Sequence, residues 1–129
     1  MAENPTKKAT LRSPRRGTPL DPSRASVRRE LFGGTGAVRV WDLGGTTPPF
    51  TAVLFCELDP LGRVGEHVQR EDQEVVVVLS GEAVLYVDGR PHGCVPGSAV
   101  ALPLGSRLSI DNASPKEPVR YVIVKARIG

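Results

Sequence analysis

Short apolar runs alternate with turn-forming segments from residue 37 to residue 127. Valine, leucine and isoleucine dominate these runs, and the turns recur about every 8 to 12 residues, the spacing of an antiparallel sandwich or barrel. Asp88-Gly89 favours a type I′ hairpin, because that turn needs positive φ at both central positions. No stretch of useful length shows the 3.6-residue period of a helix. The pattern therefore predicts one all-β domain over residues 37–127.

The first 30 residues have a different character. They contain proline, serine, threonine and many basic residues, and almost no large apolar side chain. Such a segment buries too little surface to offset the entropy lost on ordering. We therefore predict a disordered basic tail over residues 1–30, which is either a passive extension or an electrostatic arm for nucleic acid or an acidic partner. At its junction with the body, the segment SVRRELFGG, which begins at Ser26, could form a short turn of helix or an edge segment. Its basic residues are Lys7, Lys8, Arg12, Arg15, Arg16, Arg24, Arg28 and Arg29.

The bulk composition is that of a globular protein of 129 residues, with 40% hydrophobic and 24% charged residues. No apolar run reaches the roughly 18 residues of a membrane helix, and the N-terminus lacks the apolar centre of a secretory signal. We expect a cytoplasmic protein without a membrane partner. Its two cysteines, Cys56 and Cys94, are too few for a disulfide framework. Free thiols are the expectation, with a single bridge as the alternative.

Candidate chemistry lies in the stretch EHVQREDQEVVVVLSG, residues 66–81. His67 and Gln69 are two residues apart, so they share one face of a strand. Glu74 opens the next apolar run after a four-residue link, Arg70 to Gln73. A hairpin at this link brings the three side chains together. A glutamate at the start of a buried strand needs a partner for its charge.

Two spaced motifs in this sequence resemble those of the cupins, a superfamily of small jelly-roll barrels. The first cupin motif reads glycine, five residues, His-x-His, three or four residues, glutamate, six residues, glycine. Here His67, Gln69, Glu74 and Gly81 fit this spacing, and Gly62 lies one position from the leading glycine. The second cupin motif reads glycine, five residues, Pro-x-Gly, two residues, histidine, three residues, asparagine. Here Gly97, Pro103, Gly105 and Asn112 fit every spacing, and Leu108 stands at the histidine position.

The resemblance implies a double-stranded β-helix, and in metal-dependent cupins a divalent ion held by three histidines and one glutamate. The matching positions here are His67, Gln69, Glu74 and Leu108. An amide oxygen serves transition metals poorly compared with imidazole nitrogen, and leucine has no lone pair. We therefore expect either no cofactor or one Fe, Ni, Zn or Mn ion held weakly by His67, Gln69 and Glu74. In the alternative without metal, these three side chains satisfy one another's hydrogen bonds.

Two classes of function follow from this resemblance. The first is a non-catalytic barrel that binds a small molecule or serves as a structural or regulatory module. The second is a metal-dependent enzyme of the dioxygenase, isomerase or decarboxylase type, with Glu74 or His67 as general base. In either class the cavity is expected to be lined by Leu54, Cys56, His67, Gln69, Glu74, Val76, Val78 and Leu108.

The last strand segment, VRYVIVKARI, is apolar in both alternating registers. Such a strand is typically covered on both faces. Cupins often pair as homodimers, and this pattern agrees with an outer face that is covered by a second subunit. We therefore expect a homodimer.

Overall fold

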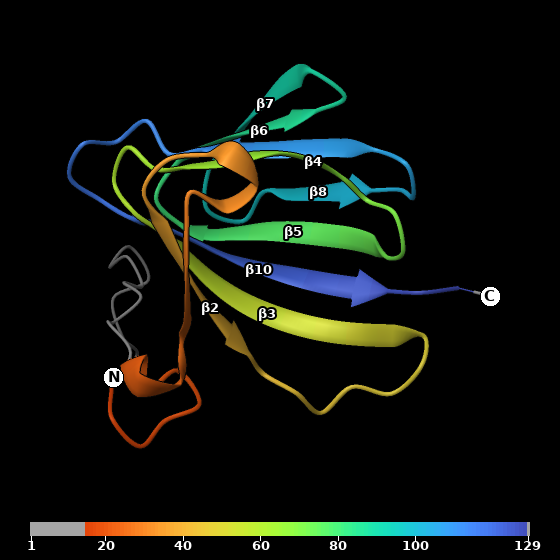
Figure 1. Cartoon of the computed structure of the whole chain (residues 1–129), viewed down its shortest axis with the longest axis horizontal. Helices are drawn as coiled ribbons and strands as arrows, with labels where there is room; N and C mark the ends of the chain where they lie inside the picture. Colours follow the sequence, from red (N-terminus) through yellow and green to blue (C-terminus); the bar gives the residue numbers. More distant parts are fainter. Residues whose placement is uncertain (1–14, 129) are drawn as a thin grey trace, which may run out of the picture.

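The computed structural model describes residues 15–128, which form two antiparallel sheets (Figure 1). The larger sheet has the order β1-β2-β3-β10-β5-β8. Its strands are β1 (Ser26–Arg29), β2 (Ala37–Asp42), β3 (Phe50–Leu58), β10 (Val119–Ala126), β5 (Gln73–Ser80) and β8 (Ala99–Leu102). The predicted all-β jelly-roll architecture is confirmed.

The smaller sheet has the order β4-β9-β6-β7. Its strands are β4 (Arg63–Val68), β9 (Arg107–Asp111), β6 (Ala83–Val87) and β7 (Arg90–Cys94). A single 3₁₀ turn, η1 (Pro22–Arg24), precedes β1, and a second, η2 (Leu31–Gly33), lies between β1 and β2. The β6–β7 hairpin turns at Asp88 and Gly89, whose φ angles are 51° and 80°. Both central positions thus have the positive φ that a type I′ turn requires, as predicted.

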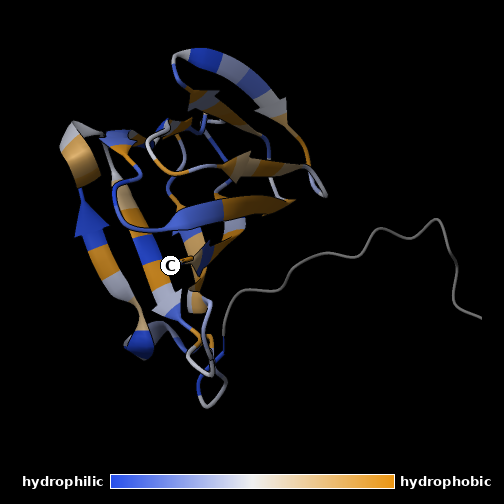
Figure 2. Ribbon diagram, turned by 90° about the vertical axis from the view of Figure 1, so that its right-hand side faces the viewer, coloured by the Kyte–Doolittle hydropathy of each residue, from blue (hydrophilic) through white to orange (hydrophobic). Residues whose placement is uncertain are grey.

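The core lies between the sheets and is almost entirely aliphatic. Apolar and polar residues alternate along several strands (Figure 2), so that one face of each is buried. On β10, Val119 and Tyr121 are buried, and Tyr121 pairs across the sheet with Cys56 and Val78. The remaining fully buried core residues include Leu58, Leu85, Leu102, Leu108, Ile110 and Val76. Both cysteines are buried free thiols, as expected.

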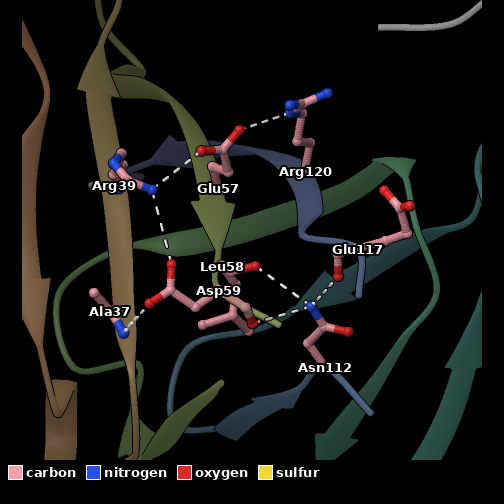
Figure 3. Close-up of polar contacts among 8 residues, drawn as sticks. All are labelled: Ala37, Arg39, Glu57, Leu58, Asp59, Asn112, Glu117 and Arg120. Carbon is pink, nitrogen blue, oxygen red and sulfur yellow. Dashed lines mark hydrogen bonds and ion pairs between the residues drawn. The ribbon is translucent and has the colours of Figure 1, made fainter. Parts of the chain in front are cut away.

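Asn112, the asparagine of the second motif, ties the ends of three segments together (Figure 3). Its Nδ2 donates to the carbonyl oxygens of Leu58, Asp59 and Glu117, at 3.4, 3.0 and 2.8 Å. Its Oδ1 accepts the backbone N–H of Ser114 at 3.0 Å. Because its exposed fraction is only 2%, these bonds satisfy a buried amide that would otherwise destabilise the fold. The end of β9 is thereby fixed to the end of β3.

An ion-pair network crosses the outer face of the larger sheet at the same end of the barrel (Figure 3). Glu57 accepts from Arg120 Nε at 2.8 Å and from Arg39 at 3.3 Å. These three residues are cross-strand neighbours on β2, β3 and β10. Glu57 and Arg120 are largely shielded, with 13% of each side chain exposed, so this pair is less screened than a surface pair.

The structure differs from the predicted tail boundary at residue 30. β1 pairs with β2 over four residues, from Ser26 opposite Val40 to Arg29 opposite Ala37. Trp41 Nε1 donates to the Asp21 carbonyl at 2.8 Å, which fixes the segment before β1. Backbone pairing at a sheet edge does not require apolar side chains, and all four β1 residues are exposed. The segment from Ser26 onward thus forms both of the elements considered for it, an edge strand, β1, and a short helical turn, η2.

The basic residues Lys7, Lys8 and Arg12 lie outside the described residues. Among residues 15–128, no helix is long and apolar enough to cross a membrane.

Candidate functional site

A cavity of about 630 Å³ opens between the two sheets and the β1–η2 segment. This volume suits a small organic molecule. Aliphatic side chains such as Val40, Leu54 and Ile123 form much of its wall. Polar and charged groups from β1, β4, β5, β10 and residues 69–72 complete it. The cavity therefore combines an apolar wall with a small polar cluster.

The structure brings most of the sequence-predicted cavity residues to this one place. Six of the eight line the cavity: Leu54, Cys56, His67, Gln69, Glu74 and Leu108. Val76 and Val78, each 1% exposed, lie instead in the hydrophobic core. Their cross-strand neighbours on β10, Ile123 and Tyr121, line the cavity in their place. The larger side chains of β10 thus form the part of the wall that the sequence pattern assigned to β5.

His67 lies on β4 directly opposite Leu108 of β9. Its Nδ1 is 3.0 Å from the Gly65 carbonyl oxygen. A carbonyl oxygen only accepts, so this bond places the proton on Nδ1 and leaves a lone pair on Nε2 of the neutral ring. The imidazole also stacks on Phe32 of η2, with ring centroids 4.1 Å apart and planes inclined by 17°. The ring is therefore fixed in both orientation and tautomer.

Gln69 follows the end of β4, and two backbone hydrogen bonds fix its position. Its N–H donates to the Ser106 carbonyl at 2.9 Å, and its carbonyl accepts the Gly105 N–H at 2.7 Å. Only 5% of the residue is exposed. Within residues 15–128, its side-chain Nε2 is buried and has no hydrogen-bond partner. Buried donors are nearly always paired, so this amide is a group in need of an acceptor.

Glu74 opens β5 and is buried, with 6% of the residue exposed. Its Oε2 lies 3.5 Å from Lys125 Nζ of β10, and the two residues are cross-strand partners. Its Oε1 is buried without a partner among the described residues. Two side chains that line the cavity, Gln69 and Glu74, therefore present one unpaired donor and one unpaired acceptor.

Burial governs the acidity of the cavity groups. It raises the pKa of the Glu74 carboxyl, and the charge and hydrogen bond of Lys125 oppose the increase. Burial also raises the pKa of Cys56 to about 12, although a hydrogen bond with Tyr121 acts in the opposite direction. The pKa of Tyr121 is raised well above its ordinary value for the same reason. Cys56 thus remains a thiol at neutral pH and has little nucleophilic character.

Among the lining residues that sequence reasoning missed, Lys125 and Phe32 bear most on the chemistry of the site. Lys125 lies two residues after Ile123 and four after Tyr121 on β10, so all three side chains share the face that lines the cavity. This alternation could have predicted the position of Lys125. A lysine near a strand end is usually solvated, which hides that signal. Phe32 belongs to an irregular segment in which Glu30 and Phe32 both have positive φ, at 51° and 54°. No sequence periodicity predicts where such a segment places its side chains.

Comparison with known proteins gives a family and a set of similar folds. The model of the family Cupin_2, described as a cupin domain, matches residues 54–125. No curated protein matches the chain.

Three similar solved structures share the fold at 20 to 23% sequence identity with this chain. A predicted oxalate decarboxylase from Thermotoga maritima is 20% identical, with a TM-score of 0.75 and coverage of 81% of this chain and 92% of the other. A Cupin 2 conserved barrel domain protein from Salinispora arenicola is 23% identical, with a TM-score of 0.65 and coverage of 92% and 89%.

A third similar structure is a sugar phosphate isomerase of the cupin superfamily from Silicibacter pomeroyi. It is 22% identical, with a TM-score of 0.63 and coverage of 84% of this chain and 74% of the other. At these identities, the likeness establishes the fold alone. The family match covers more than half of the chain, and the two antiparallel sheets enclose a cavity where the motif residues meet. The chain belongs to the cupin family.

Proposed function

We propose that this cupin barrel binds a small organic ligand in its cavity, without catalysis and without a tightly held transition metal. The observation that carries the proposal is the pairing of Glu74 with Lys125, whose ammonium nitrogen lies 3.5 Å from the carboxylate. The chain thus supplies its own cation beside the one acidic residue of the motif. A structural or regulatory role of the same barrel is compatible with this binding activity.

The donor set fits a transition metal poorly. Of the four motif positions, only His67 offers an imidazole. Leu108, 1% exposed, lies directly opposite His67 and brings no lone pair. The Lys125 ammonium repels a divalent cation at Glu74, because like charges a few ångströms apart interact strongly in a buried site. No group of three or more His, Cys, Asp or Glu side chains within residues 15–128 is placed to hold a metal ion.

Metal titration of the purified, untagged protein tests the proposal. We expect Fe²⁺, Ni²⁺, Zn²⁺ and Mn²⁺ to bind weakly, so that dialysis against buffer leaves much less than one ion per chain. Metal content after dialysis is measured by plasma mass spectrometry, and the variant His67→Ala provides the control for binding elsewhere on the surface. One ion per chain that survives dialysis, and that His67→Ala removes, would refute the proposal.

One observation favours an enzymatic alternative. The pKa of Glu74 is raised by burial, and a carboxylate with a raised pKa is a better general base near neutral pH. Glu74 or His67 would then accept a proton from a bound substrate, with or without a weakly held metal. Loss of turnover in Glu74→Gln, measured on a panel of isomerase and decarboxylase substrates, would support this alternative. Unchanged turnover would remove Glu74 from the mechanism.

We also propose that two copies of the chain associate through the outer face of the larger sheet. Val77 and Val122 are cross-strand neighbours on that face, and Val122 also pairs with Phe55. Val75, in the next row, is 39% exposed in the single chain. Light scattering is expected to give the mass of a dimer for the wild type and of a monomer for Val77→Glu, because a buried unpaired carboxylate is costly. A monomeric wild type would contradict this.

A further inference from the structure

We propose that the ligand of the cavity is a small neutral polyol, such as a free sugar or a sugar alcohol, held by its hydroxyl groups against Gln69, Glu74 and His67. This inference deepens the proposed metal-free binding function and rests on it. It is carried by the unpaired polar atoms of the cavity and by the balance of charge around them.

The two unpaired atoms are of opposite type and belong to two residues that line the same cavity. Gln69 Nε2 is a donor without an acceptor, and Glu74 Oε1 is an acceptor without a donor. An alcohol hydroxyl both donates one hydrogen bond and accepts others. A single hydroxyl group that accepts from Gln69 and donates to Glu74 would satisfy both buried atoms. A carboxylate or phosphate oxygen, which only accepts, would leave Glu74 unpaired.

His67 adds a second acceptor to the same cavity. Its Nδ1 proton is used by the Gly65 carbonyl oxygen, 3.0 Å away, so Nε2 of the neutral ring can only accept. A neighbouring hydroxyl on the ligand supplies the matching donor. His67 and Glu74 therefore each offer an acceptor, and Gln69 offers a donor. This combination favours a ligand with more than one hydroxyl group.

The charge in the cavity favours a neutral ligand. Glu74 and Lys125 form a pair at 3.5 Å. The other charged residues of the lining are two bases, Arg28 and Arg70, and two acids, Glu71 and Asp72, so the formal charges of the cavity balance. A dianion such as oxalate placed beside Glu74 would meet a like charge in a buried site and would lose its hydration. A polyol meets no like charge, and hydrogen bonds to the cavity groups offset the hydration that its hydroxyl groups lose.

The rest of the wall suits the carbon skeleton of such a ligand. Leu54, Leu108 and Ile123 line the cavity with aliphatic surface. The ring of Phe32 lies at the cavity, and the residue is 55% exposed although its ring stacks on His67. Aliphatic and aromatic surface buries C–H groups favourably. The cavity thus offers polar partners for hydroxyls and apolar surface for the carbon atoms that carry them.

Nuclear magnetic resonance titration of the full chain tests the inference, because the side-chain amide protons of Gln69 are observed directly. The probes are D-xylose, D-glucose and myo-inositol, with oxalate, succinate and cyclohexane as ligands that lack the hydroxyl pattern. We expect at least one polyol to shift the Gln69 side-chain amide and the amides of residues 67–74 in a saturable way. The three other compounds are expected to leave these signals unchanged.

Variants of the cavity residues distinguish binding in the cavity from binding elsewhere on the surface. Gln69→Leu and the nearly isosteric Glu74→Gln are each expected to weaken polyol binding by about tenfold, the effect of leaving one hydrogen-bonding group unpaired. Gln73→Leu is the matched control, because Gln73 neighbours Glu74 on β5 and faces the opposite side of the strand. Amide spectra of the free variants confirm that each one is folded.

Each outcome decides between the two proposals. Saturable binding of oxalate or succinate to metal-free protein, without polyol binding, would overturn the polyol inference and leave metal-free ligand binding intact. Binding of any probe only in the presence of one stoichiometric metal ion would overturn both. Binding of no probe, or polyol binding that Gln69→Leu and Glu74→Gln leave unchanged, would overturn the polyol inference.

Discussion

Combining Gln69→His and Leu108→His with Lys125→Met is expected to create a tight metal site in the cavity. The two new imidazoles join His67 and Glu74, and Leu108 already lies directly opposite His67 across β4 and β9. Removing the ammonium group of Lys125 frees a carboxylate that the chain otherwise pairs internally. Imidazole nitrogens are good donors to Zn²⁺ and Ni²⁺. We expect the affinity for these ions to rise on the order of a thousandfold, about 4 kcal/mol.

Calorimetric titration of the triple variant with Zn²⁺ measures this gain. The matched control adds His67→Ala to the same background and is expected to lose most of it. The double variant that retains Lys125 isolates the contribution of the ammonium group. A folded triple variant that binds Zn²⁺ no better than the wild type would show that the four positions do not converge as the account requires.

Lys125→Met is expected to destabilise the protein by about 2 kcal/mol at neutral pH, because it leaves the Glu74 carboxylate buried without its cation. Removing one partner of a fully buried pair costs roughly 3–5 kcal/mol. The expected cost is smaller here because 31% of the Lys125 side chain is exposed, and solvent screens it. Methionine retains most of the aliphatic stem, so little packing is lost.

The pH dependence of this effect has a defined sign. Burial raises the pKa of Glu74 above its ordinary value of 4.5, so the folded state holds that proton more tightly than the unfolded state. The contribution of Glu74 to stability is therefore fully present below that value and is lost as pH rises through the folded-state pKa. Lys125→Met removes a charge that favours the ionised form of Glu74. The variant is therefore expected to lose more stability than the wild type as pH rises. In acid, where Glu74 is neutral, the variant is expected to approach the wild type.

Urea unfolding at pH 4 and at pH 7 checks this prediction. The double variant Glu74→Gln, Lys125→Met completes a double-mutant cycle, and its lysine substitution is expected to cost little because no carboxylate remains. An equal cost of Lys125→Met at both pH values, or in both backgrounds, would contradict an electrostatic role for the pair.

Much of the fold could be predicted from the sequence because strands and hairpins leave local signals. Alternating apolar runs indicate strands with one buried face, and Asp88-Gly89 marks a turn whose backbone few other residues adopt readily. The spacing of His67, Gln69 and Glu74 was informative for the same reason, since side chains two residues apart share a face. These three residues line one cavity.

The remaining features depend on tertiary contacts that have no local signature. Lys125 lies in the cavity because β10 pairs with β5 in a register that places it opposite Glu74. The strand β1 forms because its backbone completes the edge of a sheet, not because its exposed side chains favour burial. Phe32 reaches His67 through a backbone with two left-handed residues. Long-range pairing determines each of these positions.

Anomalous diffraction from crystals of the wild-type protein grown with excess Zn²⁺ is the most direct test of a cavity in which Lys125 takes the place of a metal. The account predicts no anomalous peak inside the cavity and an ammonium nitrogen that remains beside the Glu74 carboxylate. A fully occupied zinc ion bound by His67, Gln69 and Glu74, with Lys125 displaced, would contradict it.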